Sequence, residues 1–371
     1  MKKSLGLFTL AFALLFAITV KVSAAEVSVA DESTLETCVA TAENVCKLSA
    51  DVELTHSLEV GKKVTIDLNG FDIVAKDGMT DDSLIIVLHG GTLTIKGEGS
   101  VSATNANAPK ARIAVKMSKG GNTETFINEN PATLVLESGT LEGTSFGISG
   151  NGKPDRVNTN VTINGGVVKG GDTGIYHPQS GKLTVNGGEV IGKTGIEMRA
   201  GELTVKGGTI TGTAVPTVTN ENGNGTTTTG AGIAIVQHTT EKELSAVVEG
   251  GTVKGYTALY HNNTENNSDE AAAKVSLKVT GGTFEATNEG KNAIYSDTKE
   301  NFITGGEFKG AVDEKFVSED LETKVIDGVT YIGESIPKNP ETGDNVLTYI
   351  LIGLMSLVAF GYASNKLRKN A

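Results

Sequence analysis

The chain has no tryptophan, and aromatic residues make up only 5% of its 371 residues. Glycine, in contrast, occurs 47 times. Few aromatics together with many glycines often indicate a chain that cannot bury enough apolar surface to fold. Here the glycines recur in pairs at regular intervals, which indicates an ordered repeat and argues against disorder.

Positive charge is also scarce. The formal net charge is −12, and three of the basic residues, Lys2, Lys3 and Lys21, lie in an N-terminal leader. The remainder of the chain is therefore more acidic still. A surface of this sign repels phosphate groups, so nucleic acid is not expected as a partner.

Both ends of the chain carry export signals. Lys2 and Lys3 precede an apolar stretch, residues 5–20, and the small residues Ser23 and Ala24 follow. This order is typical of a secretory signal peptide, residues 1–24. Near the other end, an apolar segment at 346–363 is just long enough to cross a bilayer. The basic tail after it, residues 364–371, favours the cytoplasmic side.

A short motif precedes that apolar segment: Asn339, Pro340, Glu341, Thr342 and Gly343. Motif, apolar run and basic tail together resemble the LPxTG-type cell-wall sorting signal of Gram-positive surface proteins, with Asn339 in place of leucine. The resemblance implies that a sortase cleaves between Thr342 and Gly343 and joins Thr342 to peptidoglycan. The protein is then secreted and attached to the cell wall. An ordinary C-terminal membrane anchor is the alternative.

Cysteine is limited to Cys38 and Cys46. A close pair in an exported chain favours a disulfide, with two buried free thiols as the alternative. No further Cys or His nearby offers the ligands that zinc would need together with these thiols.

The middle of the chain repeats one block. Residues 183–192 and 203–212 each contain an alternating apolar and polar stretch, a Gly-Gly pair and a single apolar residue. Alternation of period two indicates a strand with one buried face, and paired glycines permit a tight corner. A second short strand follows in most copies, at Ile175 and Ile196 for example. Two strands in a period of about 22 residues predict one turn of a parallel β-helix.

The predicted fold class is all-β: a single-stranded parallel β-helix over residues 53–334, with a β-sandwich as the alternative. Residues 25–52 form an N-terminal cap with a short helix, started by Ser33 with Glu36 three residues on. Residues 213–230 and 261–273 are expected to be loops, and 325–333 a closing strand pair. Residues 335–345 link the rod to a hydrophobic C-terminal helix at 346–363.

The stretch 64–73 looks like the opening strand of pectate-lyase-like right-handed β-helix proteins, a resemblance that spans about residues 54–310. It implies a right-handed coil and says little about activity. Lyases of that family use an arginine base with aspartate-bound calcium, and the hydrolases use clustered aspartates. Neither pattern is evident; Arg112, Arg156 and Arg199 are the arginines before the sorting motif. No catalytic residue is predicted.

Cofactors are not predicted either. Asp67, Asp72 and Asp172 offer oxygen ligands for calcium, but no EF-hand or Gly-Asp nonapeptide repeat is present. One row of side chains is a candidate binding face, because stacked turns would place its members along one side of the rod. It consists of Tyr176, His177, Glu197, Arg199, His238, Tyr260 and His261. These residues would form a shallow groove for a glycan or a peptide, or else be surface residues with no binding role.

The leading functional hypothesis is therefore a cell-wall-anchored bacterial surface protein. Its β-helical rod would act as an adhesin, a glycan-binding module or a structural wall protein, with sortase, peptidoglycan and a host or environmental glycan or protein as partners. The alternative is a wall-tethered polysaccharide lyase or glycoside hydrolase.

Overall fold

The computed structural model describes residues 24–119, 130–150, 158–216, 230–238, 241–263, 267–287 and 292–333. The leader up to residue 23, the sorting motif, the apolar segment and the basic tail lie outside these ranges, so their roles stay predictions. Among the described residues, no helix is both long and apolar enough to cross a membrane.

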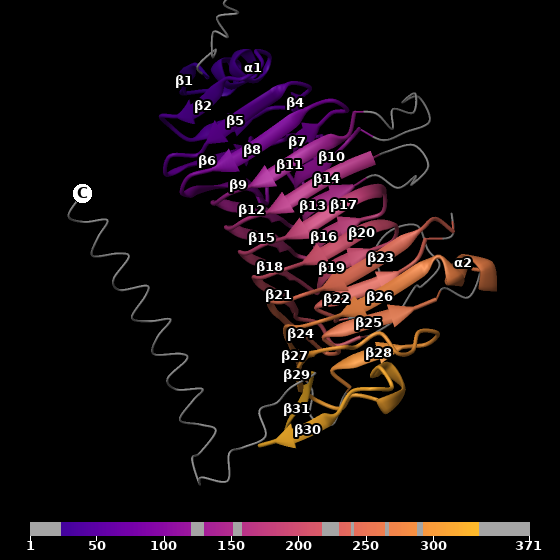
Figure 1. Ribbon diagram of the computed structural model, residues 1–371. Coiled ribbons are helices and arrows are strands. Elements are labelled where there is room, and N and C mark those ends of the chain that lie inside the picture. Colours follow the sequence, from indigo (N-terminus) through magenta and orange to yellow (C-terminus); the bar gives the residue numbers. More distant parts are fainter. Residues whose placement is uncertain are drawn as a thin grey trace, which may run out of the picture.

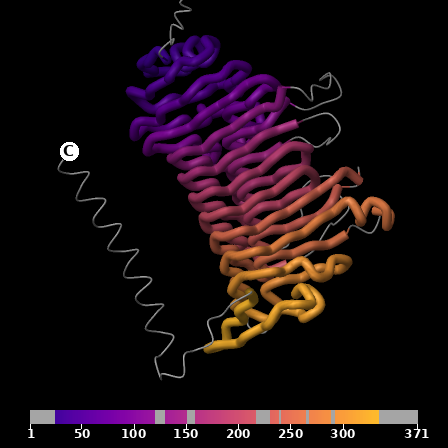
Figure 2. Tube along the Cα trace, in the orientation of Figure 1, coloured from indigo at the N-terminus to yellow at the C-terminus, as the bar shows by residue number. Residues whose placement is uncertain are grey.

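The described chain coils through three stacked sheets (Figure 1). From β2 to β28, successive strands enter the first, second and third sheet in turn, and strands one turn apart pair in parallel. Figure 2 shows the resulting rod, with the N-terminal turns at one end and the C-terminal turns at the other. The predicted parallel β-helix is confirmed.

The strands of each sheet follow in their order along the rod. The first sheet, called sheet A, contains β1 (Glu26–Val29), β2 (Val45–Leu48), β5 (Lys63–Asp67), β8 (Thr92–Lys96), β11 (Ala132–Leu136), β14 (Asn158–Ile163), β17 (Ser180–Val185), β20 (Gly201–Val205), β23 (Leu244–Val248) and β26 (Val275–Val279). Sheet B contains β3 (Val52–Leu54), β6 (Phe71–Ala75), β9 (Gly99–Ala103), β12 (Thr140–Gly143), β15 (Val167–Gly170), β18 (Glu189–Gly192), β21 (Thr209–Gly212), β24 (Thr252–Gly255), β27 (Thr283–Ala286), β29 (Gly306–Lys309), β31 (Val329–Ile332) and β30 (Thr323–Ile326). Sheet C contains β4 (Leu58–Val60), β7 (Ser83–Val87), β10 (Ile113–Met117), β13 (Phe146–Gly150), β16 (Thr173–His177), β19 (Thr194–Met198), β22 (Ile233–Val236), β25 (Leu259–Asn262) and β28 (Ile294–Ser296).

Each turn thus has three strands, where the sequence predicted two. The additional strand is the one in sheet B, which follows the Gly-Gly corner. In β18, for example, Glu189 pairs with Thr209 and Val190 with Ile210. A four-residue strand with a single buried apolar residue shows too little alternation to be recognised from the sequence.

The Gly-Gly pairs are the corners between sheets A and B, as predicted. Gly188 has φ +77°, and a Cβ atom there would lie 2.7 Å from the carbonyl oxygen of Gly166 in the preceding turn. The first glycine of the same pair, Gly187, would bring a Cβ to 2.7 Å from the Asn164 carbonyl oxygen. Both positions therefore require glycine, one for backbone conformation and close approach, the other for close approach alone.

The core consists of like residues stacked from turn to turn. Leu183 pairs with Leu203 in sheet A, and Ile175 with Ile196 in sheet C. All of these side chains belong to one continuous hydrophobic cluster. At the corner, the Asn186 amide donates a 2.8 Å hydrogen bond to the Asn164 side-chain oxygen of the preceding turn.

The N-terminal end is covered by α1 (Glu32–Val39), which packs against β1 to β4. Its N-cap is Asp31, not the predicted Ser33: the Asp31 carboxylate accepts a 2.9 Å bond from the Thr34 amide, while the Thr34 hydroxyl accepts from the Asp31 amide. The reciprocal pair places the cap two residues earlier. A disulfide joins Cys38 in α1 to Cys46 in β2, as predicted.

The C-terminal end is closed differently. The strands β30 and β31 form an antiparallel hairpin, and β31 pairs antiparallel with β29, which confirms the predicted closing strand pair. A short 3-10 helix, η1 (Glu314–Phe316), places Phe316 against Phe302. The expectation of a loop over 261–273 was wrong in part, because β25 extends to Asn262 and α2 (Asp269–Ala273) begins after the Ser268 N-cap.

Candidate functional site

The residues weighed as a binding face lie in sheet C or directly after its strands, in consecutive turns. Tyr176 pairs with Glu197, Glu197 with Ala234, Ala234 with Tyr260, and Tyr260 with Tyr295. The stacking in register that the sequence predicted is thus present. Tyr260 packs against a small apolar cluster that is separate from the main core, so this row lies on the face of sheet C that points away from the core.

The two strand histidines lie in a different row. His177 pairs with Met198, and His261 pairs with Ile235, both of which belong to the main core. His177 is 2% exposed and His261 is 1% exposed. Neither imidazole reaches the row of Tyr176 and Tyr260, because adjacent residues of a strand point to opposite faces.

His177 is held neutral between two turns. Its Nδ1 lies 3.2 Å from the Ala200 carbonyl oxygen, and its Nε2 lies 3.2 Å from the Thr159 hydroxyl. A carbonyl only accepts, so Nδ1 carries the proton and Nε2 accepts from Thr159. Burial lowers the pKa of His177 to about 4, so this histidine is a structural core residue.

His261 has a serine and an aspartate beside it, but they do not form a catalytic triad. The Ser296 hydroxyl lies 2.8 Å from His261 Nδ1, and Asp297 Oδ1 lies 3.4 Å from the same nitrogen. A triad needs the serine and the carboxylate on opposite ring nitrogens. Burial is again the main cause that lowers the pKa of His261 to about 4.

Glu197 and Arg199 form an ion pair inside the protein. The Arg199 guanidinium lies 3.2 Å from Glu197 Oε1, and both side chains are 0% exposed. His238 lies nearby, and burial followed by the charge of Arg199 lowers its pKa. An arginine beside a carboxylate is the pairing that a lyase would use, yet a polysaccharide cannot reach a fully buried pair.

Two tyrosines remain accessible at the C-terminal end of the row. The rings of Tyr260 and Tyr295 are stacked with centroids 5.3 Å apart, and Tyr295 is 40% exposed. Of the candidate binding face, Tyr260 is the member that a ligand can contact, together with Tyr295 beside it.

The three aspartates considered for calcium do not converge. Asp67 pairs with Lys96, Asp72 accepts a hydrogen bond from Ser100, and Asp172 pairs with Lys193. Each carboxylate is thus engaged with a neighbouring turn of the rod. They do not form a common cation site.

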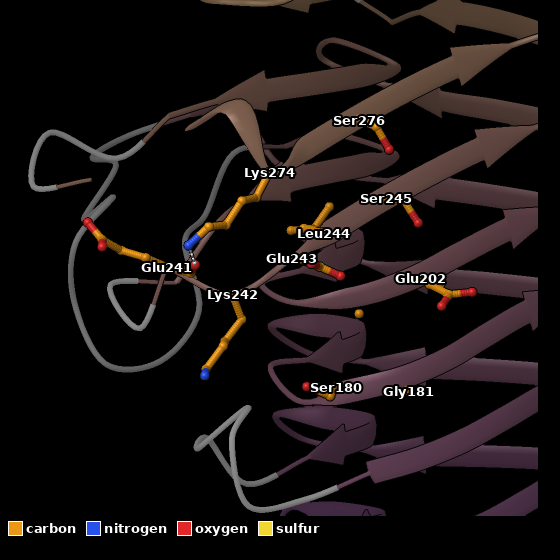
Figure 3. A pocket seen from close by; sticks show the side chains of 11 residues that line it. Ser180, Gly181, Glu202, Glu241, Lys242, Glu243, Leu244, Ser245, Lys274 and Ser276 are labelled. Atoms are coloured by element: carbon orange, nitrogen blue, oxygen red, sulfur yellow. Dashed lines mark hydrogen bonds between the residues drawn. The ribbon is translucent and has the colours of Figure 1, made fainter. Parts of the chain in front are cut away.

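The structure also has an open pocket that the sequence did not indicate (Figure 3). Its volume is about 610 Å³. Most of the residues that line it have polar side chains; the lining consists of Ser180, Gly181, Gly201, Glu202, Glu241, Lys242, Glu243, Leu244, Ser245, Lys274 and Ser276. We call it the turn pocket, because it lies where the chain passes from sheet C to sheet A.

The turn pocket results from unequal turn lengths. The chain passes from β16 to β17 and from β19 to β20 within two residues, but residues 237–243 and α2 extend the next two connections. The recess is lined by Gly181 and Gly201, which follow the short turns, and by Glu241 and Lys274, which belong to the longer connections. The length of each connection between strands can be inferred from the sequence. The recess, however, forms because short and long connections lie side by side in the folded rod.

Comparison with known proteins gave no match: no family model, no curated protein and no solved structure is significantly similar to this chain.

Proposed function

We propose that the chain is a secreted, wall-anchored surface protein whose β-helical rod acts as a glycan-binding adhesin. The observation that carries the proposal is the position of a closed rod between two segments with the sequence patterns of a signal peptide and a sorting signal. The β-helix ends in the hairpin at Ile332, and the sorting motif begins at Asn339. Anchoring at Thr342 would therefore hold the end of the rod close to the wall.

Both ends of the rod are covered, which favours binding of partners along its sides. Exposed strand edges invite pairing with other chains. Here α1 covers the N-terminal turns, and the antiparallel hairpin changes strand direction at the other end. Partners are therefore expected to bind the long faces and the connections between sheets.

The turn pocket supports a hydroxyl-rich ligand. Its volume falls in the range of small-ligand sites, about 300–1,000 Å³. Serine hydroxyls, glutamate carboxylates and lysine ammonium groups line it, and all of these hydrogen-bond readily to sugar hydroxyls. The stacked Tyr260 and Tyr295 add an accessible aromatic surface on sheet C, which suits the apolar face of a sugar ring.

Anchoring is tested by fractionation of cells that express the full chain. Thr342→Ala should shift the protein from the wall fraction, where only a wall-degrading enzyme releases it, to the membrane and the medium. Thr287→Ala, outside the motif, is the control and should leave the protein in the wall. Wall attachment that survives Thr342→Ala would contradict the sorting prediction.

Glycan binding is tested with a glycan array and the full chain in mild detergent. Glu202→Gln combined with Glu243→Gln should reduce binding at least tenfold, whereas Glu189→Gln on sheet B should not. Turnover of a polyuronate or host glycan would contradict the adhesin role and favour the enzyme. Absence of binding to any glycan would leave a structural wall protein as the better description.

A further inference from the structure

Three ligand-type side chains meet at the N-terminal end of the rod, far along the chain from the turn pocket. Glu32 and Glu36 are one helical turn apart on α1, and His56 lies in the connection between β3 and β4. One ligand atom from each of these three residues lies within 4.8 Å of the other two. Among the described residues no other such group of three is present.

Both nitrogens of the His56 ring face carboxylates. Nε2 lies 2.7 Å from Glu36 Oε1, and Nδ1 lies 3.3 Å from Glu32 Oε1. Two carboxylates beside one imidazole favour a bound cation at this position, and a metal ion held by Nε2 and the carboxylate oxygens would be one.

The hydrogen bonds around the group fit a metal ligand set. The Thr55 amide donates to Glu32 Oε1 at 2.6 Å, and the Thr55 hydroxyl donates to Glu32 Oε2 at 2.8 Å. The same hydroxyl lies 3.0 Å from His56 Nδ1. Metal-binding histidines usually engage their second nitrogen in this way, which fixes the ring and leaves the other nitrogen for the metal.

Zinc binding would require only small changes in the distances between the three ligand atoms. Zinc bonds to nitrogen and oxygen are about 2.0–2.2 Å long, so tetrahedral ligand atoms lie about 3.3–3.5 Å apart. The 2.7 Å contact between His56 and Glu36 would open slightly, and the wider separations, at most 4.8 Å, would close. His56 is 56% exposed and Glu36 is 44% exposed, so both side chains have room to move.

We propose that Glu32, Glu36 and His56 bind a divalent transition-metal ion, with Zn²⁺ as the best-suited ion. An imidazole ligand disfavours Ca²⁺ and Mg²⁺, which prefer oxygen, and suits zinc. An open pocket of about 340 Å³ beside Glu36 and His56 leaves space for water as a fourth ligand. The metal would fasten the first half of α1 to the β3–β4 connection, as the disulfide fastens its last turn to β2.

The test uses the full chain in mild detergent, with Zn²⁺ as the probe. Isothermal titration after chelator treatment should show one Zn²⁺ per chain, with micromolar affinity at pH 7.5. His56→Ala and Glu36→Gln should each weaken binding at least tenfold. Glu53→Gln is the matched control, since it removes an exposed carboxylate of β3 that is not in the group.

A second readout separates metal binding from loss of the fold. Zn²⁺ should raise the melting temperature of the wild-type protein and of Glu53→Gln but not of His56→Ala, while all three keep the same circular dichroism spectrum. Equal Zn²⁺ affinity in wild type and His56→Ala would overturn the proposal. So would no detectable binding at 100 µM Zn²⁺, which would leave the group as a set of polar contacts between α1 and the β3–β4 connection.

Discussion

At the scale of single residues, the corner glycines carry two separate constraints. Gly188 and Gly78 both have positive φ, +77° and +83°, but they differ in what an added Cβ atom would meet. A Cβ at Gly78 would meet nothing within 4 Å, whereas at Gly188 it would lie under 3 Å from the Gly165–Gly166 backbone. The two sites therefore distinguish backbone strain from crowding between turns.

We predict that Gly78→Ala destabilises the rod by about 1–2 kcal/mol, the cost of a left-handed conformation for an L residue. Gly188→Ala adds an overpacking cost of about 1–3 kcal/mol. Urea denaturation followed by circular dichroism measures both. Equal midpoints for the two variants would show that the turns can separate to admit a methyl group.

Buried histidine makes stability depend on pH. The pKa of His177 falls from 6.5 to about 4 on folding, so the unfolded chain binds more protons between these values. Stability is thus complete above pH 6.5 and decreases as the pH falls towards 4, by at most about 3 kcal/mol.

His177→Gln keeps a donor for the Ala200 carbonyl and an acceptor for Thr159 but does not titrate. Its melting temperature should fall less than that of the wild type between pH 6.5 and 5; parallel curves would contradict this account.

At the scale of elements, α1 is attached at both ends. Its last turn is bonded through Cys38 to Cys46, and its first half contacts the β3–β4 connection through Glu32 and Glu36. The buried Leu35 and Val39 place its apolar face on the first turns of the rod. A single eight-residue helix is too short to be stable without such contacts.

Cys38→Ser combined with Cys46→Ser should therefore destabilise the N-terminal turns. The closed loop is short, so the expected loss is about 2–3 kcal/mol on the chain-entropy model. Hydrogen exchange should show increased exchange in β1, β2 and α1, with little change beyond β11, because each turn contacts mainly its neighbours. A uniform increase along the whole rod would show that it unfolds as one unit.

At the scale of the whole molecule, the rod is modular between β14 and β22. Thr162, Thr184 and Thr204 occupy equivalent positions, as do Val168, Val190 and Ile210. Deletion of residues 181–200 would remove one complete turn and place Gly201 where Gly181 stood. The deletion removes both Glu197 and Arg199, so neither member of this buried ion pair remains without the other.

The shortened chain should fold with β16 paired to β22, and small-angle scattering should show a rod shorter by one strand spacing, about 4.8 Å. The circular dichroism spectrum should keep its β-sheet shape. A shortened chain that aggregates or shows no cooperative unfolding would mean that the deleted turn is required for folding and does not only add length to the rod.

The sequence by itself determined the coiled fold, the corners, the disulfide partners and the closing hairpin. These features depend on local patterns: alternation along strands, paired glycines, and cysteines close in the chain. The sheet B strands were missed because a strand such as β18 has only one buried apolar residue and is stabilised by its neighbours in the sheet.

The tertiary structure alone decided which chemical groups come together. His177 and Tyr176 are adjacent in sequence, yet one enters the core and the other faces away. Glu32, Glu36 and His56 meet because α1 lies across the first turns, and the turn pocket exists because short connections stack beside long ones. Such contacts depend on the register between turns and on how far each connection extends. Neither can be read from a single sequence, because both are set only when the turns stack on one another.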